Sequence, residues 1–118
     1  MKYFLMICEN EAAWNRLPAA EHDAIVERYS ALEQEMQQAS VLLGGHRLQP
    51  VAAATSVRVR HGRVTATDGP FAETKEQFGG YFLIEAKDLD EALRWAAKIP
   101  GAETGTLEVR PVWEYPAA

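Results

Sequence analysis

Two short runs of apolar residues constrain the fold of this chain more than any other feature. Residues 3–8 are continuously apolar, and residues 81–86 are interrupted only by Glu85. Runs of this length are typical of buried strands, and here both faces of each strand carry apolar side chains. Helices of the same chain can cover one face. The other face needs a second cover, so the pattern predicts a homodimer.

Two helices are predicted between the strands. Apolar residues at positions 25, 29, 32, 36 and 39 recur with helical spacing, which predicts a helix over about residues 20–39. Asp88 and Glu91 have the spacing of a capping box, and Pro100 and Gly101 are typical of a helix end. A second helix is therefore predicted from Asp88 to about Lys98. Residues 9–20 and 101–106 are predicted to be loops.

A β-hairpin and a stiff turn are predicted in the middle of the chain. Residues 55–60 and 63–67 alternate in polarity around a His-Gly pair, which predicts two strands with their arginines on the solvent side. The hairpin leads into Asp68-Gly69-Pro70, where Gly69 allows a positive φ and Pro70 fixes its own φ. This turn aims Asp68 in a defined direction. One helical turn is predicted over residues 74–78.

The predicted elements give one α+β domain over residues 1–118. A strand from residue 41, with a bulge at Gly44 and Gly45, and a last strand at residues 107–113 complete the order. The order β-α-β-(ββ)-β-α-β predicts a ferredoxin-like split βαβ fold with an added β-hairpin. Its antiparallel sheet would carry two helices on one face. Two such sheets packed face to face would make a dimeric α/β barrel.

The chain also resembles a known family. Residues 68–76, with the sequence DGPFAETKE, and Gly79-Gly80-Tyr81 after them resemble the signature of YCII-related proteins in the DGPF-domain branch. Residues 48–50, 89–92 and 108–112 add to a resemblance that covers nearly the whole chain. It implies a dimeric α+β barrel of the ferredoxin-like type. The family mostly has no established biochemical function. Better-studied branches are described with a His–Asp active site, a related member looks like a dehydrochlorinase acting on an aromatic-ring breakdown product, and other members are linked to sigma factors of the extracytoplasmic-function group.

Asp68 and His46 are the candidate catalytic residues. A carboxylate at a strand end beside apolar Phe71 is suited to act as a general acid or base, although Asp before Gly-Pro is also a common turn residue. His46 follows two glycines, where a ligand can approach the backbone closely. A neutral imidazole near Asp68 would make a proton-transfer pair. The alternative is a strand-end histidine that faces solvent.

Candidate substrate-binding residues are charged or aromatic side chains on the strands and around the turn. Arginines on a sheet are suited to hold a carboxylate through two hydrogen bonds, and the charged turn residues are suited to a polar ligand. All of them also have an ordinary explanation as surface side chains. The set is Arg58, Arg110, Phe71, Lys75 and Glu76. No metal is implied, because His22 with Asp23 and Glu27 lacks a fourth ligand at suitable spacing.

Composition argues against several function classes. The formal net charge is −5, which argues against a nucleic-acid-binding surface. The single cysteine, Cys8, excludes an internal disulfide and suits a reducing compartment. The apolar run near the start is too short for a signal peptide or a membrane span, so we expect a cytoplasmic protein without a membrane partner. No phosphate-binding loop or dinucleotide fingerprint is present, and no cofactor is implied.

Two functions remain open at this point. One is a small cofactor-independent enzyme of lyase or isomerase type, whose dimer encloses one cleft per subunit. There Asp68, with or without His46, would move a proton on a small anionic substrate held by Arg58 or Arg110. The other is an accessory or regulatory module in which the same cleft binds a small-molecule ligand or a protein without chemistry.

Overall fold

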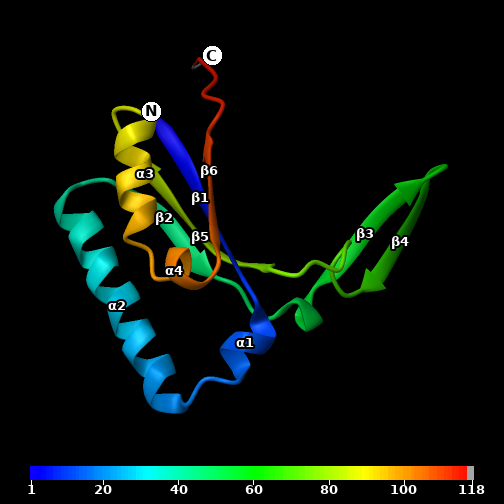
Figure 1. The fold of residues 1–118 in the computed structure, drawn as a ribbon. Helices are drawn as coiled ribbons and strands as arrows, with labels where there is room; N and C mark the ends of the chain where they lie inside the picture. The colour runs from blue at the N-terminus through cyan, green and yellow to red at the C-terminus, as the bar shows by residue number, and fades with distance from the viewer. Residues whose placement is uncertain (117–118) are drawn as a thin grey trace.

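The centre of the fold is a four-stranded antiparallel sheet with the strand order β2-β5-β1-β6 (Figure 1). It is seen in a computed structural model, which describes residues 1–116 of the chain. The two apolar runs form the neighbouring central strands β1 and β5. The sheet consists of β1 (Lys2–Glu9), β2 (Leu42–Arg47), β5 (Gln77–Glu85) and β6 (Thr106–Pro111).

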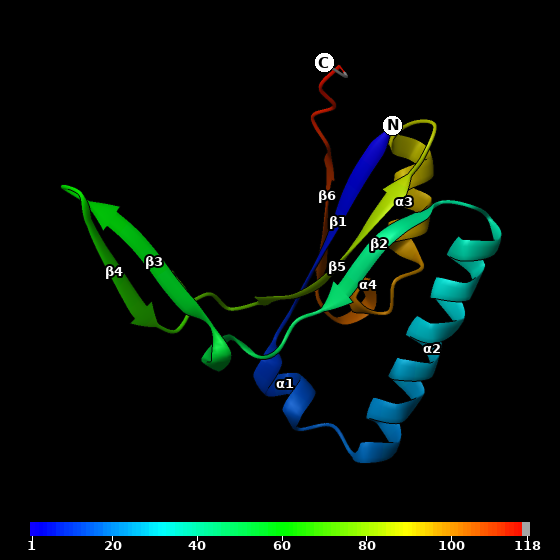
Figure 2. The ribbon, with the colours of Figure 1, turned by 180° about the vertical axis from the view of Figure 1, so that it is seen from behind.

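Two helices, α2 (Ala19–Gln38) and α3 (Leu89–Ala97), lie on the same face of this sheet (Figures 1 and 2). The core between the two layers contains the fully buried side chains Leu5, Met36, Ile84 and Ile99. The predicted capping box starts α3, because the Asp88 carboxylate accepts a hydrogen bond from the Glu91 amide at 2.9 Å. The predicted α+β, ferredoxin-like arrangement is thus confirmed.

Three local predictions are wrong. Residues 9–20 are not all loop, because Asn10 caps a short helix, α1 (Glu11–Asn15), by accepting a hydrogen bond from the Ala13 amide at 2.9 Å. Residues 101–106 contain a further short helix, α4 (Gly101–Thr104), which Pro100 begins rather than prevents. No helical turn forms over residues 74–78, because the chain enters β5 at Gln77, where it pairs with the last residue of β1.

Helix α2 packs on the sheet along only part of its length. Leu32 and Met36, in its C-terminal half, are buried in the core. Towards its N-terminus the helix leans away from the sheet, as Figure 1 shows, and Val26 is 46% exposed. The space between this half of α2 and the sheet is partly closed by α1. No helix among residues 1–116 is long and apolar enough to cross a membrane.

The predicted hairpin forms, but as a separate two-stranded sheet. Strands β3 (Thr55–Arg60) and β4 (Arg63–Asp68) follow a 3₁₀ turn at Val51–Ala53 and stand away from the rest of the molecule (Figure 2). We call these two strands the arm. His61 and Gly62 both have positive φ, 53° and 73°, as a tight two-residue hairpin turn requires. Gly69, just after the arm, has the predicted positive φ, 99°.

The uneven packing of α2 leads to a testable prediction. Met36→Ala should lower the free energy of unfolding by about 2–5 kcal/mol, because it leaves a cavity in the core. Val26→Ala, nearly three turns earlier on the same helix, should cost less than about 1 kcal/mol, because Val26 is half exposed. Urea unfolding at one fixed protein concentration measures both values. Equal losses would show that α2 is packed along its whole length.

Candidate functional site

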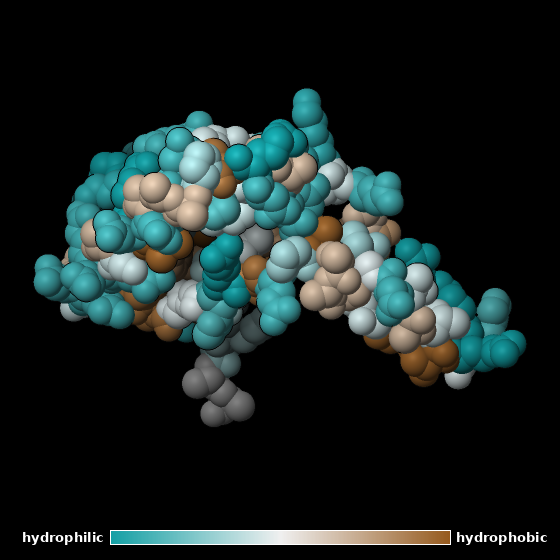
Figure 3. Space-filling model, turned by 90° about the horizontal axis from the view of Figure 1, so that it is seen from below, coloured by the Kyte–Doolittle hydropathy of each residue, from teal (hydrophilic) through white to brown (hydrophobic). Residues whose placement is uncertain are grey.

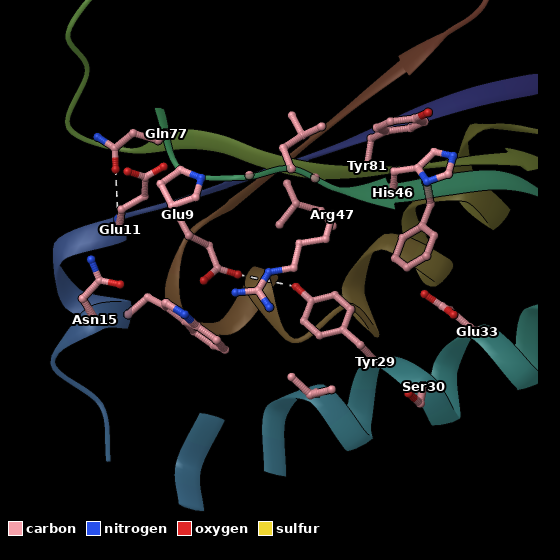
Figure 4. A pocket seen from close by; sticks show the side chains of 18 residues that line it. Glu9, Glu11, Asn15, Tyr29, Ser30, Glu33, His46, Arg47, Gln77 and Tyr81 are labelled. Atoms are coloured by element: carbon pink, nitrogen blue, oxygen red, sulfur yellow. Dashed lines mark hydrogen bonds between the residues drawn. The ribbon is translucent and has the colours of Figure 1, made fainter. Parts of the chain in front are cut away.

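A cavity of about 360 Å³ lies where α2 leaves the sheet (Figure 4). Its walls come from α1, from the N-terminal half of α2 and from the adjoining parts of β1, β2 and β5. The apolar wall consists of Ile7, Trp14, Val26, Tyr29, Leu48, Pro50 and Phe82. The charged residues that border the cavity are Glu9, Glu11, Glu33 and Arg47, with His46 beside them. This combination of an apolar wall and a few converging polar groups is typical of a small-molecule site.

Glu9 and Tyr29 are connected inside this cavity. The Tyr29 hydroxyl donates a long hydrogen bond of 3.5 Å to Glu9 Oε1, drawn as a dashed line in Figure 4. The same hydroxyl accepts a hydrogen bond of 3.2 Å from the Gly101 amide at the start of α4. The amide therefore orients the hydroxyl towards the carboxylate. Three elements, β1, α2 and α4, meet at this chain of hydrogen bonds.

The surroundings of these two groups change their pKa values. Burial raises the pKa of the Glu9 carboxyl, and the charge of Glu76 adds to the rise, while the Tyr29 hydrogen bond and the Arg47 charge oppose it. Burial and then the Glu9 charge raise the pKa of Tyr29 to about 12. Tyr29 thus keeps its proton at neutral pH as a hydrogen-bond donor. Glu9 is a better proton acceptor than an exposed glutamate.

Arg47 brings a positive charge to the same cavity. Its Cζ lies 5.2 Å from the centre of the Trp14 ring, a cation–π distance. Trp14 is itself held by the His22 ring, which stacks on it at 4.3 Å and bonds through Nε2 to the Trp14 carbonyl oxygen at 2.6 Å. Within residues 1–116 Arg47 makes no ion pair. Its guanidinium, which points towards Glu9 and Tyr29 in Figure 4, can therefore bind an anion.

His46 borders the cavity, but its side chain belongs to the other face of the sheet. Neighbouring residues of a strand point to opposite faces, so His46 and Arg47 diverge. His46 pairs with Tyr81 on β5, and the two rings meet edge to face at 6.0 Å. Asp68 lies exposed at the end of β4 and does not line the cavity. Within one chain no hydrogen bond joins Asp68 to His46 among the described residues.

The predicted substrate-binding residues are spread over the surface. Arg58 is exposed on the arm, and Phe71 and Lys75 are exposed in the segment between the arm and β5. Arg110 on β6 pairs with Glu108 at 2.5 Å. Glu76 is half-buried and accepts a hydrogen bond of 2.8 Å from the Thr106 hydroxyl. Of these five residues, Glu76 alone influences a group in the cavity, because its charge contributes to the raised pKa of Glu9.

The charged and aromatic residues that meet in the cavity were not predicted from the sequence. Tyr29 belongs to the apolar stripe of a helix, a pattern that indicates core packing. Glu9 and Arg47 are charged residues at strand ends, where solvent exposure is the usual expectation. One available signal is the acidic residue directly after the apolar run of β1, because it predicts a carboxylate at the edge of the core.

Comparisons with known proteins agree with this architecture. The family described as YCII-related domain matches residues 1–116. The chain belongs to this YCII-related family. An uncharacterised protein of Rhizobium meliloti (strain 1021), R00369, is 36% identical over 118 residues, which cover 95% of this chain and 93% of that relative. Assignment of this YCII-related chain to the DGPF branch stays a prediction.

The contact between α4 and Glu9 can be tested at Gly101. A Cβ at this position would overlap Glu9 Oε1 and lie 2.8 Å from Ile7 Cγ2 and 3.1 Å from the Tyr29 hydroxyl. Gly101→Ala should therefore cost about 1–3 kcal/mol of stability through overpacking. Gly44→Ala is the control, because a Cβ there meets nothing within 4 Å. In urea unfolding the control should equal or slightly exceed the wild type; equal effects of the two changes would contradict the crowding at Gly101.

A second prediction concerns the pH dependence of stability. Because the folded chain binds the Glu9 proton more tightly than the unfolded chain, stability falls as pH rises from about the ordinary value of 4.5 through the raised pKa. Glu9→Gln removes this loss. The variant should be more stable than the wild type at neutral pH, with an advantage that shrinks as the pH falls towards 4.5.

Urea unfolding of the wild type and Glu9→Gln at a series of pH values measures this difference. The control is Glu33→Gln, which removes the same charge from an exposed residue that also borders the cavity. A gain for Glu9→Gln that is independent of pH, or that Glu33→Gln shares, would show that the cavity does not perturb Glu9.

Proposed function

We propose that this YCII-related protein is a small enzyme of lyase or isomerase type that moves a proton on a small carboxylic acid bound in the cavity. The observation that carries the proposal is the position of Glu9. Its carboxylate has a raised pKa, accepts a hydrogen bond from the Tyr29 hydroxyl and lies in the same cavity as Arg47. A proton acceptor and a site for an anion thus occupy one largely apolar space.

In this proposal Arg47 binds the carboxylate of the substrate. A guanidinium offers two parallel N–H donors to a carboxylate, and an arginine without an ion pair has these donors free. The apolar remainder of the substrate packs against the wall formed by Val26, Tyr29 and Phe82. The cavity of about 360 Å³ suits a molecule with one ring or a short branched chain.

Glu9 then accepts the proton. It removes a proton from a carbon next to a carbonyl group, and the electron pair of the broken C–H bond moves onto the carbonyl oxygen. In an isomerisation, the neutral Glu9 carboxyl returns the proton to another carbon. In an elimination, the leaving group departs with its bonding electrons instead. The Tyr29 hydroxyl, held by the Gly101 amide, keeps the carboxylate in place.

The proposed enzyme is a homodimer, because the face of the sheet opposite α2 and α3 is apolar and carries no helix of residues 1–116. On this open face the ring of Phe4 stacks on Tyr81 at 5.0 Å and meets Phe78 at 6.1 Å. The apolar residues of the open face are Phe4, Met6, Cys8, Phe78, Tyr81 and Leu83, all half-buried. A second copy that covers this face would build the two-sheet barrel. His46 also points to this face, so a pair with Asp68 is proposed only for the dimer, where the arm is brought against another chain.

Proton exchange in D₂O tests the proposed function. The probe is 3-benzoylpropionate, an aromatic keto acid with exchangeable protons next to its ketone. Loss of their ¹H NMR signal should be catalysed by the wild type. Glu9→Gln should slow the exchange by at least about 10²-fold, the usual contribution of a general base. Arg47→Gln should weaken binding of the probe more than it slows exchange at saturation.

Glu27→Gln is the matched control for Glu9→Gln, because it removes the same charge from an exposed residue that does not line the cavity. It should leave the exchange rate little changed. Thermal denaturation with the same probe separates binding from chemistry. Stabilisation of the wild type but not of Arg47→Gln, without any exchange, would identify a ligand-binding module instead of an enzyme. Stabilisation that depends on Asp68 rather than Arg47 would place the site elsewhere.

A further inference from the structure

The arm has one apolar and one basic face. Cross-strand partners in an antiparallel pair point to the same side, and the register pairs Val57 with Ala66 and Val59 with Val64. We call the side formed by Val57, Val59, Val64 and Ala66 the valine face. The opposite side carries Ser56, Arg58, Arg60, Arg63, Thr65 and Thr67. Figure 3 shows apolar surface along one edge of the arm and hydrophilic surface along the other.

No other part of residues 1–116 covers the valine face. Val57, Val59 and Val64 are 63%, 56% and 70% exposed. An isolated two-stranded hairpin is at best marginally stable in water and needs a packed apolar face. The radius of gyration of the chain is 16.5 Å, against about 13–14 Å for a compact domain of this size. The arm thus extends away from the four-stranded sheet and the helices of its own chain, which therefore do not bury its valine face.

The direction and charge of the arm point to one kind of partner. Figures 1 and 2 show the arm projecting on the side of the sheet opposite α2 and α3, which is the side of the open face. The arm carries three arginines and one aspartate, a formal charge of +2. Because the whole chain carries −5, the residues outside the arm together carry −7. A second copy of this chain therefore offers both an apolar sheet face on the correct side and an acidic body.

We propose that the valine face of the arm docks on the body of a second copy of this chain. In a symmetric dimer each chain extends its arm across the other, and both arms are covered in the same way. This inference rests on the homodimer proposed above but adds a separate contact to it. The register places Asp68 on the valine face, at the base of the arm. Docking therefore brings this carboxylate to the interface between the two chains.

The test compares two neighbouring positions of β4 that point to opposite sides. Val64→Asp places a charge on the valine face, and Thr65→Asp adds the same charge to the basic face. Sedimentation equilibrium should give a dimer dissociation constant at least about tenfold higher for Val64→Asp, equivalent to roughly 1.4 kcal/mol. Thr65→Asp changes the charge of the arm equally but lies away from the contact, so it should raise the dissociation constant much less than Val64→Asp does. An equal dissociation constant for all three proteins, or a wild type that is monomeric at every concentration, overturns the inference.

A second measurement uses the arginines of the arm as trypsin sites. In the wild type, cleavage after Arg58, Arg60 and Arg63 should be slow above the dimer dissociation constant and fast after dilution below it. Val64→Asp should be cleaved fast at the concentration that protects the wild type. Cleavage that does not depend on concentration overturns the inference.

Leu83→Glu, on the open face of the sheet, distinguishes the contact between the two open faces from the docking of the valine face. If Leu83→Glu gives a monomer while Val64→Asp dimerises like the wild type, the homodimer stands and the docked arm is wrong. Neither result depends on proton exchange in the cavity, so the proposed chemistry is tested independently.

Discussion

Strand β1 pairs with both β5 and β6, and this pairing positions the helices and the cavity. The strand carries Tyr3, Leu5 and Ile7 into the core on one face, and it carries half-buried side chains on the other. Its position in the middle of the sheet fixes where the helices can pack. The same strand ends at Glu9, two residues after Ile7 and on the same side of the sheet. The cavity therefore lies directly beside the core.

The cavity exists because α2 does not follow the sheet along its full length. The buried anchor of Leu32 and Met36 holds the C-terminal half of the helix, while the N-terminal half leans outwards. Aromatic side chains and α1 line the space, and water is only partly excluded. A carboxylate at its inner end is therefore half-buried, which raises its pKa and costs stability when it ionises. In the proposed function this cost is offset, because a proton acceptor needs such an environment.

Two apolar surfaces of this YCII-related chain are not covered by any of residues 1–116: the open face of the sheet and the valine face of the arm. Both lie on the side away from α2 and α3, and a single partner can cover both. The two surfaces differ in character. The open face is an aromatic and aliphatic layer built on the central strands, whereas the valine face belongs to a hairpin with arginines on its back. Docking of the arm would add a contact with the partner chain outside the area where the two sheets meet.

Local periodicity and turn chemistry were enough to predict the two central strands, the two long helices, the hairpin, the positive φ of Gly69 and the capping box at Asp88. They did not determine the short helices α1 and α4 or the start of β5, where capping and strand pairing override the composition of the segment. The meeting of Glu9, Tyr29, Arg47 and Gly101, in contrast, depends on long-range packing. These residues come from four elements far apart in the chain, and their contact arises from how α2 and α4 pack against the end of β1, which no local pattern encodes.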